Sequence, residues 1–210
     1  MSDLNNLPTK MNHEDWKNAY SQKEVPHWAK ELESSPLASE LLKSLPSRSK
    51  ILEIGVGNGR DSIFFAQNGN QVIGIDIALG AVKLAKKNAQ NLDLAEKIDF
   101  RIGNVEKMEF EDKSFDAVYS ISVLHSTVLP DSISEITRVL KPGGKAILYF
   151  YEMTQNGGKK YWFYRQNQAE RIFKENGLNI EDKWDFWDSR HEKETTKVMV
   201  FKLNKSTSTT

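Results

Sequence analysis

The chain has 210 residues, of which 39% are hydrophobic and 28% charged, so its composition is that of one globular domain and excludes disorder throughout. Its 29 basic and 29 acidic side chains cancel, so composition gives no support to a nucleic-acid partner or to binding at an acidic membrane. The absence of cysteine excludes disulfides, thiolate metal sites and a cysteine nucleophile, and four scattered histidines predict no metal site.

The two ends of the chain predict neither a signal peptide nor a membrane anchor. Met1–Lys10 is polar and asparagine-rich, and no apolar run approaches the roughly 20 residues of a membrane helix. We expect a cytoplasmic protein with no membrane partner, either a monomer or a weak homodimer. Residues 1–45 are expected to form a helical cover, 46–204 the main domain and 205–210 a disordered tail.

From residue 50 onward, short apolar runs alternate with helical patterns. The expected strands are Lys50–Val56, Gln71–Ile77, Ile98–Ile102, Phe115–Ser122 and Lys145–Tyr151, with two more near Leu178–Trp187 and Lys197–Leu203. The expected helices are Arg60–Gln67, Ala81–Asn91, Ser132–Leu140 and Gln168–Asn176. This alternation predicts an α/β fold with a mostly parallel sheet covered on both faces. In such a sheet, ligands bind beyond the carboxyl ends of the strands.

Local signals set the ends of two of these helices. Ser132 and Glu135 have the spacing of a capping box, which predicts that the third helix begins at Ser132. Pro142-Gly143-Gly144 is expected to end that helix, and Gly177 is placed as the cap of the fourth.

A glycine-rich loop follows the first expected strand. Its sequence, Glu53-Ile54-Gly55-Val56-Gly57-Asn58-Gly59-Arg60, has G-x-G-x-G spacing instead of the G-x-G-x-x-G of dinucleotide sites. The acid inside the loop would repel a pyrophosphate, whereas a cationic ligand fits. Asp76, at the end of the second strand, is placed to accept both hydroxyls of a ribose. Together these features describe a nucleoside that carries a positive charge, and S-adenosylmethionine is such a molecule.

Five motifs in order then resemble the class I S-adenosylmethionine-dependent methyltransferases over nearly the whole chain. They are Ile51–Gly59, Val72–Ile77, Gly103–Glu106, Ser114–Ser120 and Leu140–Gly144. The resemblance implies a Rossmann-like, doubly wound, seven-stranded sheet in a single domain. It also implies an enzyme that transfers a methyl group from S-adenosylmethionine to a small-molecule acceptor.

The resemblance implies a cofactor site at the carboxyl ends of the strands. The three loop glycines would line the methionine end of the cofactor, and Glu53 would bind its ammonium or hold the loop through backbone donors. Asp76 would accept the ribose hydroxyls. Asn104 stands where the family more often has an acid, and an amide there can still bond a base edge. The full expected set is Trp16, Tyr20, Glu53, Gly55, Gly57, Gly59, Arg60, Asp76, Ile77, Asn104, Val105 and Ile121.

The N-terminal segment narrows the resemblance to one group of small-molecule enzymes. Trp16-Lys17-Asn18-Ala19-Tyr20, followed by Val25-Pro26-His27-Trp28, resembles the opening of methyltransferases related to the tellurite-resistance and thiopurine enzymes. Arg60-Asp61 and Asp188-Ser189-Arg190-His191 resemble that group as well. Trp16 and Tyr20 either cover the cofactor or anchor a helix in the core, and the sequence leaves both alternatives open.

Two histidines are candidates for catalysis. His125 follows the fourth strand, at the rim where the methyl group should point, and could act as a base. His191 is the second candidate, for orienting the substrate, and either histidine could instead be an ordinary loop residue. The aromatic stretch Tyr161–Arg165 could line an acceptor pocket. Two other functions stay open: a non-catalytic module that binds the cofactor, and a nicotinamide-dependent oxidoreductase, which the glycine spacing disfavours.

Overall fold

The computed structural model describes residues 13–21, 26, 29–156, 159–191 and 194–207. The strands are β1 (Lys50–Ile54), β2 (Gln71–Asp76), β3 (Ile98–Ile102), β4 (Phe115–Ile121), β5 (Leu140–Asn156), β6 (Lys159–Trp162), β7 (Leu178–His191) and β8 (Glu194–Lys205). The helices are α1 (His13–Ala19), α2 (Pro36–Leu42), α3 (Arg60–Gln67), α4 (Leu79–Gln90), α5 (Leu129–Val139) and α6 (Gln166–Glu175). Short 3₁₀ turns lie at η2 (Ala95–Lys97) and η3 (Leu124–Ser126).

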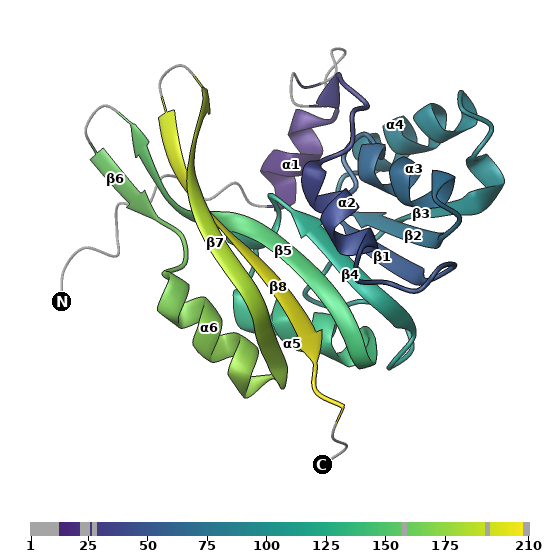
Figure 1. Cartoon of the computed structure of the whole chain (residues 1–210). Helices are drawn as coiled ribbons and strands as arrows, with labels where there is room; N and C mark the ends of the chain where they lie inside the picture. Colours follow the sequence, from purple (N-terminus) through teal and green to yellow (C-terminus); the bar gives the residue numbers. More distant parts are fainter. Residues whose placement is uncertain (1–12, 22–25, 27–28, 157–158, 192–193, 208–210) are drawn as a thin grey trace.

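The strands form one sheet in the order β3-β2-β1-β4-β5-β8-β7 (Figure 1). Strands β1 to β5 pair in parallel, whereas β8 pairs antiparallel with both β5 and β7. These seven strands confirm the predicted α/β sheet. The short strand β6 is an addition that pairs with the far end of β5. Because the chain turns back from β3 to β4 beside β1, the switch point of the sheet lies between β1 and β4.

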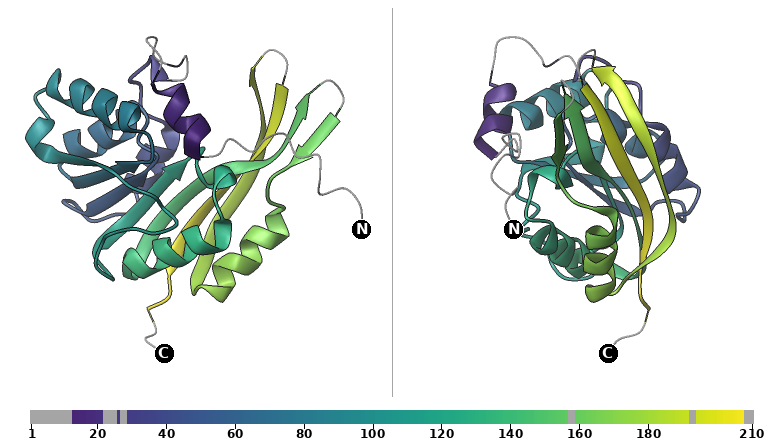
Figure 2. Two further views of the ribbon diagram at one scale, coloured as in Figure 1. Left: turned by 180° about the vertical axis from the view of Figure 1, so that it is seen from behind. Right: turned by 90° about the vertical axis from the view of Figure 1, so that its left-hand side faces the viewer.

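Helices cover the sheet on both faces, as predicted (Figure 2). One core layer packs α2, α3 and α4 against the sheet, with Leu41, Phe65 and Ile51 fully buried in it. The other layer packs α5 and α6 against the opposite face, around Ile133, Phe150 and Phe173. The central strands β1 and β4 are therefore buried on both faces, which explains their continuous apolar runs.

The start of α5 differs from the prediction. The helix begins at Leu129, with proline in its first turn, and not at Ser132. Ser132 is fully buried within the helix, and its hydroxyl bonds the Thr127 hydroxyl at 2.9 Å. Glu135 does not cap the helix either, because its carboxylate accepts the backbone N–H of Met108 at 2.6 Å. The sequence has the spacing of a capping box, but tertiary contacts use both side chains elsewhere.

The three strands β5, β7 and β8 are longer than expected, with 17, 14 and 12 residues. β5 begins directly at Leu140, so Pro142-Gly143-Gly144 lies within this strand and not before it. The long strands continue past the ends of β1 to β4 and rise above the rest of the sheet (Figure 1). Within the described part of the chain, every helix is too short or too polar to cross a membrane.

Candidate functional site at the carboxyl ends of the strands

The glycine-rich loop turns back directly after β1. The backbone N–H of Gly55 donates to the Ile75 carbonyl of β2 at 2.8 Å, which pins the loop to its neighbour strand. Gly55 has a φ of +78°, and a Cβ built on it would lie 2.1 Å from a Val123 methyl. Gly57 has a φ of +54°, another conformation that side chains with a Cβ resist. The loop then ends at Gly59, the cap of α3, so the first N–H groups of that helix face the same edge.

Asp76 lies at the end of β2, beside the loop. Its carboxylate accepts the backbone N–H of Gly57 at 3.1 Å and that of Ala78 at 2.9 Å. Burial raises the pKa of this carboxyl, and the backbone donors oppose the rise. The glycine loop and the acid that the sequence predicted are therefore neighbours, joined by a direct hydrogen bond.

Glu53 is buried beneath the loop, at 4% exposure. Its carboxylate accepts hydrogen bonds from the hydroxyl and the backbone N–H of Ser62, in the first turn of α3. Burial raises the pKa of Glu53 well above its usual range, and the neighbouring Asp61 carboxylate raises it further. Two carboxyl groups thus lie together under the glycine loop, and a positive charge nearby would stabilise their ionised forms.

The remaining predicted cofactor residues surround the same edge. Arg60 begins α3 and is half-buried, with its Nε 3.8 Å from the Asp61 carboxylate. Ile77 follows β2 and Ile121 ends β4, both half-buried. Asn104 follows β3, where its Oδ1 accepts the N–H of Glu106 at 3.0 Å, and Val105 beside it is 5% exposed.

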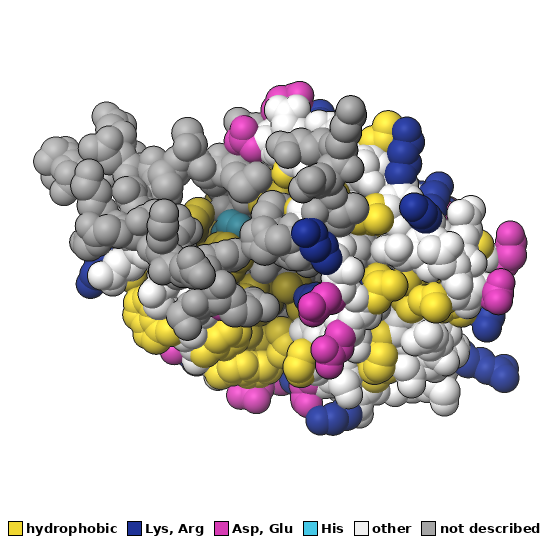
Figure 3. All heavy atoms as spheres, turned by 90° about the horizontal axis from the view of Figure 1, so that it is seen from above, with side chains coloured by type: hydrophobic (Ala, Val, Ile, Leu, Met, Phe, Trp, Pro, Cys, Tyr) yellow, Lys and Arg dark blue, Asp and Glu magenta, His cyan; other side chains and the backbone are white. Residues whose placement is uncertain are grey.

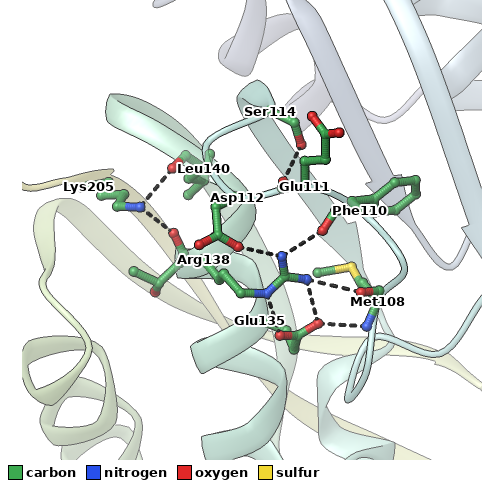
Figure 4. Close-up of polar contacts among 10 residues, drawn as sticks. Met108, Phe110, Glu111, Asp112, Ser114, Glu135, Arg138, Leu140 and Lys205 are labelled. Carbon is green, nitrogen blue, oxygen red and sulfur yellow. Dashed lines mark hydrogen bonds and ion pairs between the residues drawn. The ribbon is translucent and has the colours of Figure 1, made fainter.

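Arg138 of α5 holds the segment that carries these last residues (Figure 4). Its guanidinium donates to the backbone carbonyls of Met108 at 3.0 Å and Phe110 at 2.6 Å, and to the Asp112 carboxylate at 2.8 Å. It also bonds Glu135 of its own helix at 2.7 Å, and this contact lowers the pKa of the Glu135 carboxyl. Arg138 therefore anchors residues 108–112 of this segment to α5, in addition to the contact that Asn104 makes within the segment.

His125 lies in η3, directly after β4, and is 5% exposed. Its ring stacks on Tyr151 of β5, with centroids 4.0 Å apart, and meets the Phe163 ring edge-on at 5.4 Å. Tyr151 continues the set of rings to Tyr149, which contacts Phe186 of β7. Seen from above, hydrophobic side chains gather in a patch at the lower left of the view (Figure 3).

The structure describes only some of the remaining predicted residues. Trp16 in α1 and Tyr20 just after it are half-buried. His27 and Trp28 lie outside the described residues. His191 ends β7, and its side chain lies outside the described part, so the structure does not relate it to His125.

Sequence reasoning missed other contributors to this edge. Asn58, Asp61, Ser62 and Tyr151 all contact predicted site residues or the loops that carry them. Asn58 stands within the recognised glycine motif and Asp61 follows it directly, so the motif itself was the available signal. No sequence signal pointed to Tyr151, because only the pairing of β5 with β4 brings it near His125.

A shallow depression at the opposite edge of the sheet carries no part of this site. It is lined by residues at the start of β1, β2 and β3, among them Lys50, Gln71 and Asp99. Those strand starts lie at the amino edge, and the glycine loop and Asp76 lie at the carboxyl edge.

Comparison with known proteins agrees with this geometry. Residues 52–148 match a family described as "Methyltransferase domain". Sterol 24-C-methyltransferase ERG6 of Saccharomyces cerevisiae is 37% identical over 106 residues, which are 50% of this chain and 28% of that enzyme. The 27-O-demethylrifamycin SV methyltransferase of Amycolatopsis mediterranei is 34% identical over 118 residues, 53% of this chain and 43% of that enzyme. The chain thus spans less than half the length of either relative.

A solved structure extends the likeness to most of the chain. Geranyl diphosphate C-methyltransferase from Streptomyces coelicolor, in complex with Mg²⁺, geranyl diphosphate and S-adenosyl-L-homocysteine, superposes with a TM-score of 0.67. The superposition covers 90% of this chain and 87% of that one at 15% identity, so it establishes the fold. The strand order and the glycine-rich loop after β1 agree with the match of residues 52–148 to the methyltransferase domain family.

Proposed function

We propose that the protein transfers a methyl group from S-adenosylmethionine to a small-molecule acceptor. The observation that carries the proposal is the hydrogen bond from the Gly57 N–H to the Asp76 carboxylate. It brings a glycine cradle and a ribose-binding acid to one edge, above two buried carboxyl groups that favour a cation.

The residues present fit a positively charged nucleoside. The ribose would be held by Asp76, the methionine end by the backbone of residues 55–59, and the adenine between Ile77 and Val105. Burial favours the protonated form of Glu53, and the positive charge of a bound sulfonium ligand would stabilise the ionised form beneath the loop. The same carboxylates would repel a pyrophosphate, so the site disfavours a nicotinamide dinucleotide.

When bound, S-adenosylmethionine supplies a methyl group on a sulfonium, already activated for attack. The chain's own task is to align an acceptor with that group and to keep water away. We assign alignment to the side of the site beyond β4, where His125 stacks on Tyr151. For an acceptor with a hydroxyl or amine, His125 would take the proton that the nucleophile releases, at one of its imidazole nitrogens.

We infer that the protein belongs to the group of small-molecule methyltransferases related to the tellurite-resistance and thiopurine enzymes. Support comes from Trp16 in α1 and Tyr20 just after it, and from Arg60-Asp61 at the start of α3. Binding assays that compare soft acceptors, such as aryl thiols, with sterols would test this finer assignment.

The proposal is tested in two steps with the full chain. Calorimetry should show binding of S-adenosylhomocysteine and no binding of NAD, and the reverse result would make the protein an oxidoreductase candidate. A screen of small molecules with methyl-labelled cofactor should then give a labelled product. Tight cofactor binding without any product over a broad panel would favour a non-catalytic binding module.

His125→Phe separates the catalytic role of this residue from packing, because the substituted ring can still stack on Tyr151. We expect kcat to fall by roughly 10²-fold for a hydroxyl acceptor, a typical contribution of a positioned base, with cofactor affinity unchanged. An unchanged kcat would leave His125 with a packing role alone.

A further inference from the structure

Asn58 lies inside the glycine loop, yet its side chain binds the N-terminal segment of the chain. The side chain is buried, at 4% exposure. Its Nδ2 donates to the carbonyl oxygens of Ala29 at 3.2 Å and Glu31 at 2.6 Å. Its Oδ1 accepts the N–H of Arg60 at 3.3 Å. Both polar ends of the amide are therefore engaged, one with the N-terminal segment and the other with the start of α3.

Asp61 makes a second contact from the same motif to the same segment. Its carboxylate accepts the backbone N–H of Ser35 at 2.7 Å, and the residue is 3% exposed. Ser35 is in turn the N-cap of α2, with its hydroxyl accepting the Leu37 N–H at 3.3 Å. Within four residues, the glycine motif thus holds three positions of the segment 29–35.

The first part of the N-terminal segment lies against the same loops. A Cβ built on Gly57 would lie 3.1 Å from the Tyr20 hydroxyl, and one on Gly80 would lie 2.1 Å from the Tyr20 carbonyl oxygen. His13 approaches the Glu106 carboxylate at 3.8 Å. Residues 13–21 therefore reach the loops after β1, β2 and β3, the three that we propose to hold the cofactor (Figure 1).

We propose that Asn58 is a positioning residue that couples docking of the N-terminal segment, residues 13–21 and 29–35, to cofactor binding. The inference rests on the proposed function. A ligand held by the backbone of residues 55–59 fixes the loop, and so fixes the direction of the Asn58 amide. The segment then docks on an ordered partner. Because coupling between two binding events is reciprocal, the docked segment raises cofactor affinity by the same factor.

The test replaces Asn58 and measures both sides of the coupling. In Asn58→Ala we expect S-adenosylhomocysteine to bind about tenfold more weakly by calorimetry, equivalent to about 1.4 kcal/mol. We also expect amide hydrogens of residues 13–21 and 29–35 to exchange faster in the ligand-bound protein. Asn68→Ala is the matched control, since Asn68 follows the other end of α3 and its side-chain amide donates to the Phe64 carbonyl of its own helix, at 2.8 Å. It should change neither quantity.

Two further variants sharpen the test. Asn58→Asp places a carboxylate against two carbonyl oxygens, so both effects should exceed those of the alanine variant. Gly80→Ala displaces Tyr20 and disturbs the same segment from its other end. If both changes act through the segment, the double variant Asn58→Ala/Gly80→Ala weakens binding by less than the product of the single factors. If Asn58→Asp does not fold, the comparison of the double variant with the two single variants still tests the proposal.

Each outcome decides the proposal. Weaker ligand binding with unchanged exchange would mean that Asn58 contacts the cofactor directly, and the proposal would be wrong. Faster exchange with unchanged affinity would leave Asn58 with a structural role alone, and would overturn it as well. If the wild-type protein does not bind S-adenosylhomocysteine, the proposed function fails instead, and the exchange of the segment in the unliganded protein still reports whether Asn58 docks it.

Discussion

The two halves of the sheet are built differently. In the half formed by β1 to β4, the strands have five to seven residues and stop at one edge, where glycines and carboxylates follow them. In the half formed by β5, β7 and β8, the strands run 12 to 17 residues and continue past that edge, carrying aromatic rings. Short parallel strands thus present backbone groups at their ends, whereas long antiparallel strands present side chains along their length.

This difference separates two tasks. In the proposed function, backbone N–H groups and a few acids of the parallel half bind the cofactor, which is the same molecule whatever the acceptor. Rings on long strands form a surface whose shape depends on each side chain, which suits recognition of one particular acceptor. Changes in the parallel half should therefore alter cofactor affinity most, and changes in the other half should leave it almost untouched.

The largest effect should come from Gly57→Val. A branched side chain resists a φ of +54°, and its methyl groups would fill the space between the loop and the Tyr20 hydroxyl. We expect no measurable binding of S-adenosylhomocysteine by calorimetry. Gly69→Val is the control, because Gly69 also has a positive φ of +82° but has open space around it, so it should lose stability and keep binding. Normal binding by Gly57→Val would place the ligand elsewhere.

Asp76→Ala should have the next largest effect. It removes the carboxylate proposed for the ribose hydroxyls, and charge-assisted hydrogen bonds contribute roughly 1.5–3 kcal/mol each. We expect the Kd for S-adenosylhomocysteine to rise at least tenfold. Asp99→Ala tests specificity, since Asp99 is an exposed acid on β3 paired with Arg101. An equal loss in both variants would show a general charge effect and not a ribose contact.

Glu53→Gln should change stability with a defined dependence on pH. Because burial raises the pKa of Glu53 in the folded protein above its usual 4.5, the stability from its protonated form is complete below that value. That stability is lost as the pH rises through the folded-state pKa. Glutamine keeps the neutral form at every pH, so the Tm of the variant should fall less than that of the wild type between about pH 5 and pH 8.

The same variant should bind the cofactor more weakly, because it lacks the negative charge under the loop. Glu96→Gln, at an exposed glutamate in η2, should leave the pH profile of the Tm unchanged. Parallel profiles for wild type and Glu53→Gln would contradict the pKa shift.

The smallest effect on cofactor affinity should come from Phe186→Ala in the antiparallel half. Phe186 is 40% exposed on β7, and its ring contacts Tyr149 at 6.0 Å between centroids. We expect the Kd for S-adenosylhomocysteine to change less than twofold, within the range of an ordinary surface substitution. The KM for an acceptor found by the screen should rise instead. A tenfold loss of cofactor affinity would mean that the two halves do not act separately.

How much the sequence predicts also differs between the halves. The loops after β1 and β2 follow from local patterns, because glycines at fixed spacing and an acid after a buried strand each have a local physical reason. Local patterns could not identify the first residue of α5. Both Pro130 and Ser132 are acceptable starts, and the burial of Ser132 against Thr127 decides between them.

The contacts of the site that escaped prediction are those between distant parts of the chain. Asn58 bonds residues 27 and 29 positions away, and Asp61 bonds one 26 positions away. No periodicity or spacing signals such a pair, because each partner is a backbone group that every residue has. The aromatic contact between His125 and Tyr151 escaped for a different reason, because it depends on the register between strands.

Arg138 has a practical consequence for protein engineering. Its guanidinium holds residues 108–112 largely through the main-chain oxygens of Met108 and Phe110, which no substitution removes. The side chains of Lys107, Glu109 and Glu111 are exposed. A combinatorial library at these three positions can therefore vary the surface of the segment that carries the proposed adenine contacts while the loop keeps its course, and cofactor analogues with enlarged bases are the natural targets for selection.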